Sequence, residues 1–245
     1  GESVNEERNR IKRFKIEHNG KEKEINVKCF SRKNRITEFI YKYFKGSKGK
    51  RSYLYGRKLL QLGIKTPEPI AYFDDYYDET AEEKRTFYIS ENLEYQLTCR
   101  EIFGNGNFTH EAKEIIKKDK EKLIKLFTEF TFSLHEKGVE FHDYSPGNVL
   151  IKKTNDDSYE FYLIDLNRMT FRKKLGFSRR MRNVSRMMEE TQYIEKFSKY
   201  YSELYKKNYL RVFFRLYSFV KIHESNVAIK DNTRTFRYLF KRKKR

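Results

Sequence analysis

The chain has 245 residues, 38% of them hydrophobic and 36% charged, with a formal net charge of +19. This length suffices for one large domain or two lobes, and the sequence lacks the run of about 18 apolar residues that spans a membrane. Two cysteines, Cys29 and Cys99, give no disulfide framework or metal-binding spacing, so a reducing compartment is expected. The charge indicates anionic partners (nucleic acid, anionic lipid or phosphorylated substrates) without choosing among them.

The first hundred residues are predicted to be mainly strands. An Asn-Gly pair at positions 19–20, between alternating polar and apolar residues, is typical of a β-hairpin. Gly63 and the Thr-Pro-Glu-Pro segment that follows it predict the end of a helix and an extended turn. The expected strands cover residues 13–17, 24–30, 70–74 and 86–90, with an acidic loop at 75–83, and the expected helices cover residues 35–44 and 52–62.

Helices are predicted to dominate the remainder of the chain. The longest is expected at about 119–137, where Leu123, Leu126, Phe127, Phe130 and Leu134 recur at helical spacing. Two short strands are expected at 149–152 and 160–165, and helices again from Glu189 on. The pattern predicts an α+β, bilobal fold, with a small β-rich N-lobe at 1–92 and a larger helical C-lobe at 93–245 that ends in a basic tail.

One stretch, FHDYSPGNVLI followed by FYLIDLN, carries the chemistry. It places Asp143, Asn148 and Asp165 in the order and spacing that phosphoryl transfer from Mg-ATP requires. Asp143 is the candidate base that orients the attacking hydroxyl, and Asn148 and Asp165 are the candidate Mg²⁺ ligands. The structural alternative is that Asp143 only caps the turn before Pro146.

The ATP-binding residues are predicted from the N-terminal half. Lys28, at the end of a strand, is the candidate for neutralising the α- and β-phosphates, with a solvated strand lysine as the alternative. Its usual glutamate partner is missing from the following helix, which leaves Glu38 as the candidate, and no G-x-G-x-x-G loop occurs. These two departures keep a pseudokinase open. The segment after the strand at 86–90 is expected to connect the two lobes, and its main-chain groups are expected to bind adenine. The alternative is an ordinary loop. The residues concerned are Glu91, Asn92 and Leu93.

The motif set resembles the lipopolysaccharide kinase (Kdo/WaaP) family. The resemblance rests on Val27-Lys28, on KRSYLYGRKLLQLGIKTPEPIAY, on LHEKGVEFHDYSPGNVLI and on FYLIDLNRM, and it covers roughly residues 10–190. It implies a protein-kinase-like fold and ATP-dependent phosphorylation of Kdo or heptose in the lipid A–inner core, at the cytoplasmic face of the bacterial inner membrane. By the same resemblance Asp143 is the base, Asn148 and Asp165 bind Mg²⁺, and Lys28 binds the ATP phosphates.

A basic run follows Asp165, and residues 168–187 contain no acid. Guanidinium groups suit lipid A phosphates and Kdo carboxylates through paired hydrogen bonds, although a solvated basic loop is the alternative. The aromatic and basic tail at 234–245 is expected to meet anionic headgroups, with a disordered tail or, less favoured, nucleic-acid binding as alternatives. The candidate acceptor-binding cations are Arg168, Arg172, Lys173, Lys174, Arg179, Arg180, Arg182 and Arg186.

Two other functions compete with a Kdo–lipid A kinase. A protein Ser/Thr kinase or a small-molecule kinase would use the same catalytic residues, but the basic acceptor side disfavours cationic small molecules. A pseudokinase that binds membrane or RNA would explain the missing glutamate and glycine loop. The partners expected for the leading hypothesis are core lipopolysaccharide precursors and the anionic inner-membrane surface.

Overall fold

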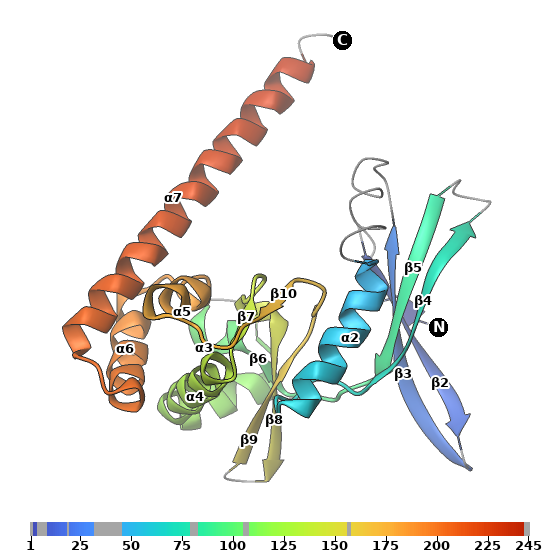
Figure 1. The fold of residues 1–245 in the computed structure, drawn as a ribbon, viewed down its shortest axis with the longest axis horizontal. Coiled ribbons are helices and arrows are strands. Elements are labelled where there is room, and N and C mark those ends of the chain that lie inside the picture. Colours follow the sequence, from blue (N-terminus) through green and yellow to red (C-terminus); the bar gives the residue numbers. More distant parts are fainter. Residues whose placement is uncertain are drawn as a thin grey trace. The chain divides into compact units, whose positions relative to one another are not determined.

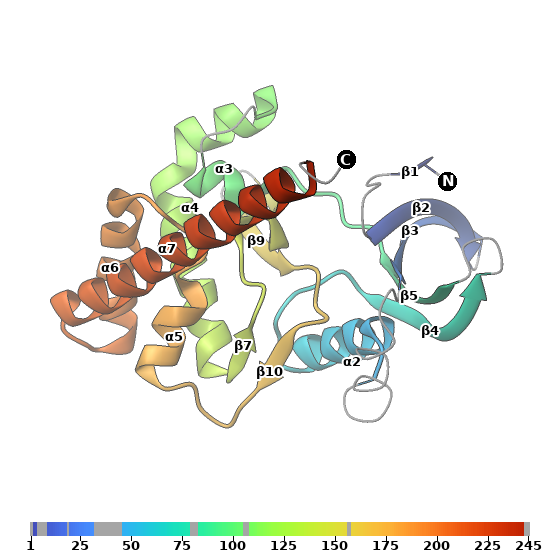
Figure 2. The same cartoon turned by 90° about the horizontal axis from the view of Figure 1, so that it is seen from above.

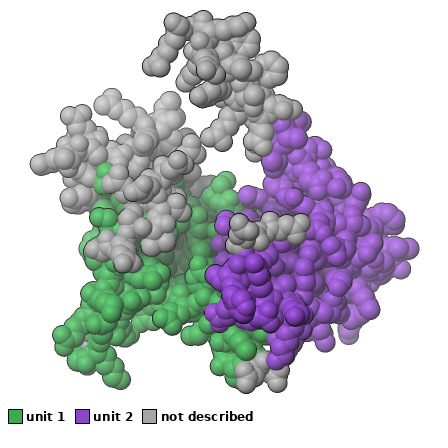
Figure 3. All heavy atoms as spheres, turned by 180° about the vertical axis from the view of Figure 1, so that it is seen from behind, with its two compact units in different colours: residues 1–96, 141–143, 148–170 green, residues 97–140, 144–147, 171–245 purple. Residues whose placement is uncertain are grey.

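The computed structural model of the protein describes residues 2–3, 9–18, 20–31, 46–78, 83–104, 108–155 and 158–242; side chains at 2–3, 9–10, 18, 31, 75–78, 83–84 and from 230 onwards lie outside this description. The chain forms two compact units, coloured separately in Figure 3. Unit 1 comprises residues 1–96, 141–143 and 148–170, and unit 2 comprises residues 97–140, 144–147 and 171–245. The division into lobes at 92/93 stays a prediction.

Unit 1 is built on a five-stranded antiparallel sheet in the order β1-β2-β3-β5-β4 (Figure 1). The predicted hairpin is confirmed and longer than expected, because β2 and β3 pair along their whole length up to a turn at Gly20, whose φ is +70°. Figure 2 shows that the sheet is strongly curved. The strands are β1 (Glu2–Ser3), β2 (Asn9–His18), β3 (Lys21–Ser31), β4 (Pro69–Asp78) and β5 (Glu83–Glu91).

Helix α2 (Lys48–Gln61) packs on strands β4 and β5. It begins before the predicted residue 52 because the Ser47 side chain accepts a hydrogen bond of 2.9 Å from the Lys50 amide. A Cβ at Gly49 would lie 2.5 Å from the Phe87 carbonyl oxygen, so the helix approaches the sheet closely only because this residue is glycine. The sheet and this helix together hold the strand that carries Lys28.

A second hairpin, β8 (Val149–Asn155) and β9 (Ser158–Leu163), belongs to unit 1. Val149 pairs with Leu163, and the Ile164 amide donates to the Asn148 carbonyl at 3.1 Å. The Thr66 hydroxyl donates to the Leu163 carbonyl at 2.7 Å. These bonds bring the residues that flank the hairpin beside the N-terminal strands. Two short strands, β7 (Val139–Phe141) and β10 (Met169–Phe171), each contain residues of both units.

Unit 2 is helical, and its core lies between α4, α6 and α7. The predicted apolar positions Leu123, Phe127 and Leu134 on α4 are fully buried. Aromatic rings fill the remaining space, with Phe127 5.0 Å from Phe103 between ring centroids. Its elements are β6 (Leu97–Thr98), α3 (Cys99–Phe103), α4 (His110–Glu136), η1 (Pro146–Asn148, of which Asn148 belongs to unit 1), α5 (Phe177–Val184), α6 (Thr191–Tyr205) and α7 (Tyr209–Arg242).

Strands early in the chain and helices later confirm the α+β class, with three local corrections. Helix α4 begins at His110 and not near 119, because the Thr109 hydroxyl accepts from the Ala112 amide at 3.2 Å. The expected acidic loop at 75–83 is shorter, since β4 continues to Asp78 and β5 begins at Glu83. Helix α5 was not predicted. The helix predicted at 35–44 lies outside the described residues.

Among the described residues, no helix combines the length and the apolar character needed to cross a bilayer.

Candidate active site

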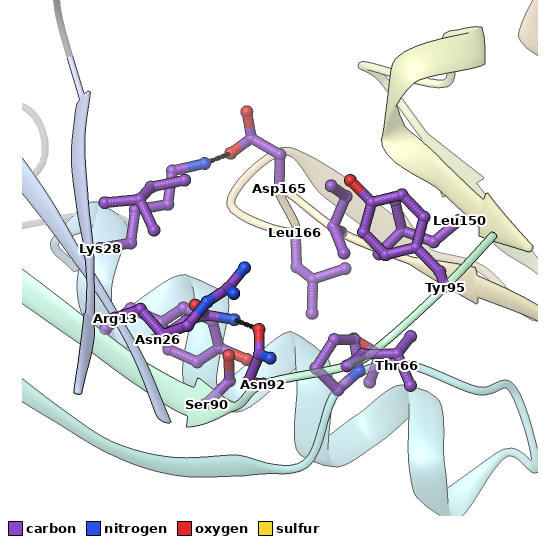
Figure 4. A pocket seen from close by; sticks show the side chains of 15 residues that line it. Arg13, Asn26, Lys28, Thr66, Ser90, Asn92, Tyr95, Leu150, Asp165 and Leu166 are labelled. Atoms are coloured by element: carbon purple, nitrogen blue, oxygen red, sulfur yellow. Dashed lines mark hydrogen bonds and ion pairs between the residues drawn. The ribbon is translucent and has the colours of Figure 1, made fainter. Parts of the chain in front are cut away.

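The Lys28 ammonium group and the Asp165 carboxylate form an ion pair, with Nζ 2.8 Å from Oδ1 (Figure 4). Lys28 lies on β3, opposite Tyr88 of β5, and Asp165 follows β9. Their side chains are 16% and 28% exposed. The pair is thus partly shielded from solvent but still open to a ligand, which is the state expected of two groups that bind phosphate and metal in turn.

Asp165 has a φ of +58°, a left-handed conformation that non-glycine residues adopt rarely. The Asn167 amide nitrogen donates to its Oδ1 at 2.7 Å, so the lysine and the asparagine together orient one carboxylate oxygen. Unusual backbone conformations of this kind are concentrated at ligand sites. The Asp165 carboxylate points toward Lys28 (Figure 4).

Asn148 and Asp165 have the donor atoms that suit Mg²⁺. The Asn148 side-chain nitrogen donates to the Asp143 carbonyl at 2.9 Å, so Oδ1 is the atom of this amide that remains for a metal. The hydrogen bond from Ile164 to the Asn148 carbonyl keeps the backbones of the two candidate ligands adjacent. One carboxylate and one amide oxygen, completed by phosphate oxygens and water, fit the coordination that Mg²⁺ prefers.

Asp143 lies in the same unit and faces Arg168. The Arg168 Nη1 atom is 3.2 Å from both carboxylate oxygens of Asp143. The Arg168 side chain is 62% exposed and that of Asp143 is 21% exposed. His142, next to Asp143, hydrogen-bonds through Nε2 to the Thr170 hydroxyl at 2.8 Å, as a residue with a local structural role would.

A cavity of about 190 Å³ opens beside Lys28 and Asp165 (Figure 4). Ile11, Leu150 and Leu166 contribute apolar walls to the cavity. The polar side chains of Asn26, Ser90 and Asn92 lie together near the end of β5. Burial raises the pKa of the Tyr88 hydroxyl well above its ordinary value, so this group of the lining stays neutral. All of the lining residues belong to unit 1. An apolar cavity with a few convergent polar groups is the usual form of a small-molecule or cofactor site.

The connector after β5 is fixed by a small hydrogen-bond network. Asn26 donates to the Asn92 side chain at 2.9 Å, and Asn92 donates to the Glu24 carboxylate at 3.0 Å. The Glu91 and Asn92 amides also donate within the protein, to the carbonyls of Glu68 and Glu24. Of the predicted adenine-binding residues, Asn92 and Leu93 line the cavity, while the Glu91 carboxylate pairs with Lys23 at 2.7 Å.

The predicted acceptor-binding cations occupy different environments. In unit 2, Glu140 receives Arg172 at 2.8 Å and Arg179 at 3.4 Å. Arg180 is buried, with Nη1 2.5 Å from Glu136. The Arg182 guanidinium lies 5.1 Å from the centre of the Phe219 ring. Lys173, Lys174 and Arg186 are exposed on the same segment.

Sequence reasoning missed the role of Asn26 and Thr66 in the cavity. Asn26 was within reach, since it lies two residues before Lys28 and therefore on the same face of the strand. Thr66 gives no local signal, because its position depends on the contact with Leu163. Glu38, the candidate partner of Lys28, lies outside the described residues. Within the part of the chain that the structure describes, the Asp165 carboxylate pairs with Lys28.

Comparison with known proteins identifies the family. The model of the lipopolysaccharide kinase (Kdo/WaaP) family matches residues 7–213. A structure of WaaP in complex with acyl carrier protein is similar with a TM-score of 0.57 and 16% identity, over 92% of this chain and 87% of that chain. The Rio2 kinase–ADP/Mg²⁺–phosphoaspartate complex from Chaetomium thermophilum gives a TM-score of 0.50 and 13% identity, over 88% and 60%. No curated protein matches the sequence.

The two structural likenesses show a protein-kinase-like fold, as predicted. The family match covers most of the chain and confirms the resemblance noted in the sequence, and with it an ATP-dependent transfer of phosphate to a sugar hydroxyl. The chain belongs to the lipopolysaccharide kinase (Kdo/WaaP) family and is a kinase of the lipopolysaccharide core.

Proposed function

We propose that this protein phosphorylates a hydroxyl of Kdo or heptose in the lipid A–inner core, with Asp143 as the catalytic base. One observation carries the proposal: Lys28, Asp165, Asn148 and Asp143 are gathered within unit 1, by hydrogen bonds and ion pairs of 2.8–3.2 Å. These groups come from sequence positions more than a hundred residues apart. Lys28 and Asp165 line one cavity, and hydrogen bonds join Asn148 to the backbone of Asp143 and to that of Ile164, the residue before Asp165. Phosphoryl transfer needs such an assembly, which a set of turn-capping residues would not produce.

The cavity of unit 1 is the proposed nucleotide site. Its apolar walls suit the faces of adenine, and the Leu93 amide is the connector group proposed to donate to the base, because the Glu91 and Asn92 amides already have acceptors. When nucleotide binds, Lys28 exchanges the Asp165 carboxylate for the α- and β-phosphates. Asp165 and Asn148 would hold Mg²⁺, and the ion would neutralise negative charge on the phosphates. Glu38 remains the candidate for a further partner of Lys28.

Asp143 is proposed to take the proton of the acceptor hydroxyl. A carboxylate acts in this way only when it lies within hydrogen-bond reach of that hydroxyl and keeps its charge. The Arg168 guanidinium lies beside this carboxylate, with Nη1 3.2 Å from Oδ2. The Asn148 side chain, by bonding the Asp143 carbonyl, fixes the backbone of the base to one of the proposed metal ligands.

An anionic acceptor accounts for the cation beside the proposed base. Arg168 is proposed to bind a phosphate or carboxylate of the core sugar. Lys173, Lys174 and Arg186, which are exposed in unit 2, are further candidates for binding the acceptor. Arg172, Arg179, Arg180 and Arg182 remain candidates, although each has a partner within unit 2. The reaction is proposed to take place at the cytoplasmic face of the bacterial inner membrane. Residues 1–92 and 93–245 are proposed to be the two lobes of the kinase.

The acceptor is tested with γ-labelled ATP and Mg²⁺ against purified Kdo–lipid A, heptose-containing core lipopolysaccharide, and a basic protein substrate. We expect label on a glycolipid, none when EDTA is added, and none with an Asp143→Asn variant. Fragment mass spectrometry of the product then assigns the phosphate to Kdo or heptose. Label that appears on the protein substrate and on neither glycolipid would overturn the proposal.

A further inference from the structure

Helix α7 exposes a row of large apolar side chains to solvent. Leu210, Phe214 and Ile222 are 54%, 60% and 55% exposed, and they recur at multiples of four residues, on one side of the helix. Exposed apolar residues scattered singly are ordinary, but a row of them on one helix face marks a binding surface. We call this row, together with Arg211, Arg215 and Lys221, the α7 face.

The orientation of the helix is set by its opposite side. Val212, Leu216 and Val220 are completely buried, and the helix packs on α5 and α6 within unit 2. The α7 face therefore points away from the core of unit 2 while a separate apolar stripe fills that core. Figure 1 shows the helix continuing well past α5 and α6. Ile229, near the end of its described side chains, is 61% exposed.

Cations are interleaved with the exposed apolar residues. Arg211 and Arg215 each follow directly after one of them, and Lys221 directly precedes Ile222. The two arginines also lie near aromatic rings, at 5.5 Å from Phe177 and 5.9 Å from Phe219. Glu224 adds an acid beside the row and pairs with Lys221 at 2.8 Å. The balance of the face remains positive.

The small polar residues of this side do not oppose burial. The Ser218 hydroxyl donates to the Phe214 carbonyl at 2.7 Å, and the Ser225 hydroxyl donates to the Lys221 carbonyl at 2.9 Å. Because both hydroxyls are satisfied by their own helix, moving this side into an apolar environment leaves neither without a partner.

We infer that the α7 face binds the surface of an anionic lipid bilayer, with the helix lying in the plane of the interface. Apolar side chains that enter the acyl boundary between cations that meet headgroups are the pattern of interfacial helices. The inference stands on the helix itself and rests on the proposed function only for the place where a glycolipid acceptor would be met. The family match ends at residue 213, so most of α7 lies beyond it.

Two other partners fit this surface less well. Nucleic acid would satisfy the cations but offers no apolar environment for Phe214 and Ile222. A second copy of the chain would cover the apolar row but would bring Arg211, Arg215 and Lys221 against the same cations. The sequence that follows supports a lipid surface, because residues 230–245 add further cations and Asp231 as their acid; these cations are Lys230, Arg234, Arg237, Lys241, Arg242, Lys243, Lys244 and Arg245.

The experiment is vesicle flotation of the full chain with phosphatidylcholine alone and with about 30% phosphatidylglycerol added. We expect the protein to float with the anionic vesicles and to be released as salt rises. A triple variant, Leu210→Ser, Phe214→Ser and Ile222→Ser, should bind them at least about tenfold more weakly, because three apolar side chains are lost from the interface. Circular dichroism and thermal melting check that it is folded.

A matched control replaces exposed apolar residues of unit 1, Leu54→Ser and Phe73→Ser, which are 48% and 57% exposed; it should float like the wild type. The inference would be overturned if the triple variant floated with anionic vesicles as well as the wild type does. It would also be overturned if the wild type bound neutral vesicles as well as anionic ones. A dimer in light scattering that the same substitutions dissociate would overturn it too. Transfer to a detergent-dispersed acceptor should be unchanged in the triple variant, which separates a failure of this surface from a failure of the proposed kinase activity.

Discussion

Ion pairs in the two units of this protein use the same chemistry in different surroundings. In unit 1, Lys28 pairs with Asp165 and Arg168 pairs with Asp143. In unit 2, Arg180 pairs with Glu136. The Arg168 side chain is 62% exposed, whereas that of Arg180 is 2% exposed. Both arginines belong to the basic run after Asp165. They are therefore the same residue type in the same segment and differ in burial.

This difference separates cations that can exchange partners from cations that hold the fold. An exposed pair contributes about 0–1 kcal/mol to stability, so a phosphate or carboxylate ligand displaces it easily. A buried guanidinium keeps its partners, because losing one leaves a charge without compensation. Arg180 also donates to the Leu175 carbonyl at 2.7 Å and lies 4.5 Å from the Tyr205 ring centre. We therefore expect substitutions in unit 1 to change activity, and those around Arg180 to change stability.

The largest effect is expected at the base. Asp143→Asn removes the proton acceptor while keeping the shape of the side chain, so kcat should fall by about 10³-fold or more. Stabilisation by Mg-ATP in a thermal melt should persist, because Lys28, Asn148 and Asp165 are unchanged. Retained transfer in this variant would show that Asp143 is not the base and that its contact with Arg168 is structural.

Arg180→Ala is expected to destabilise the protein by about 3 kcal/mol, since it removes a buried guanidinium together with its hydrogen bonds. Urea unfolding followed by circular dichroism measures the change. Arg179→Ala is the matched control, because Arg179 is the preceding residue and its side chain is 47% exposed; about 0.5 kcal/mol or less is expected there. Equal losses in both variants would contradict a distinction based on burial.

His135 tests the same core by pH. Burial, with a smaller effect from the Arg180 charge, lowers the pKa of His135 from 6.5 to about 3, and its ring bonds Tyr201 and Asn183. Between about pH 3 and pH 6.5, His135 is mostly protonated in the unfolded chain and mostly neutral in the native protein. Stability contributed by the neutral ring is therefore complete above pH 6.5 and declines by up to about 1.4 kcal/mol per pH unit as the pH falls toward 3.

Replacing His135 by Gln should remove that part of the pH dependence. Urea unfolding of the wild type and of His135→Gln at pH 7.5 and pH 5 measures the difference in slope. We expect the variant to be less stable at pH 7.5 and to lose less stability on acidification. Parallel pH profiles for the two proteins would mean that His135 does not titrate as its burial requires.

The smallest effect is expected at Arg168. Arg168→Ala should raise the KM for an anionic glycolipid acceptor by about tenfold, as for the loss of one charge-assisted hydrogen bond, and leave the KM for ATP within about twofold. Arg57 is a comparable control in unit 1, since its side chain is 50% exposed and pairs with Glu68 at 2.9 Å. A change in the KM for ATP alone would show that Arg168 acts in nucleotide binding and not in acceptor binding.

Local pattern predicted much of this protein because the relevant signals lie close together in the chain. The β2–β3 hairpin, the C-terminal end of α2 and the presence of strands β4 and β5 follow from turn residues, helix-stop signals and alternation. Helix α5 was missed because the strongly basic segment that contains it was interpreted as a substrate-binding loop. The burial of Arg180 within that helix depends on Glu136, Leu175 and Tyr201, which no local pattern connects to it.

The sequence by itself determined the family, the α+β class and the order Asp143, Asn148, Asp165, because residue types and their spacing can be recognised without the fold. Only the tertiary structure decided that Asp165 is the carboxylate facing Lys28, that Asn26 and Thr66 line the cavity, and which basic residues pair within the fold. The physical reason is that burial and charge pairing depend on contacts between residues far apart in the sequence. Among the arginines that follow Asp165, those contacts separate a residue that faces the proposed base from one that is buried in unit 2.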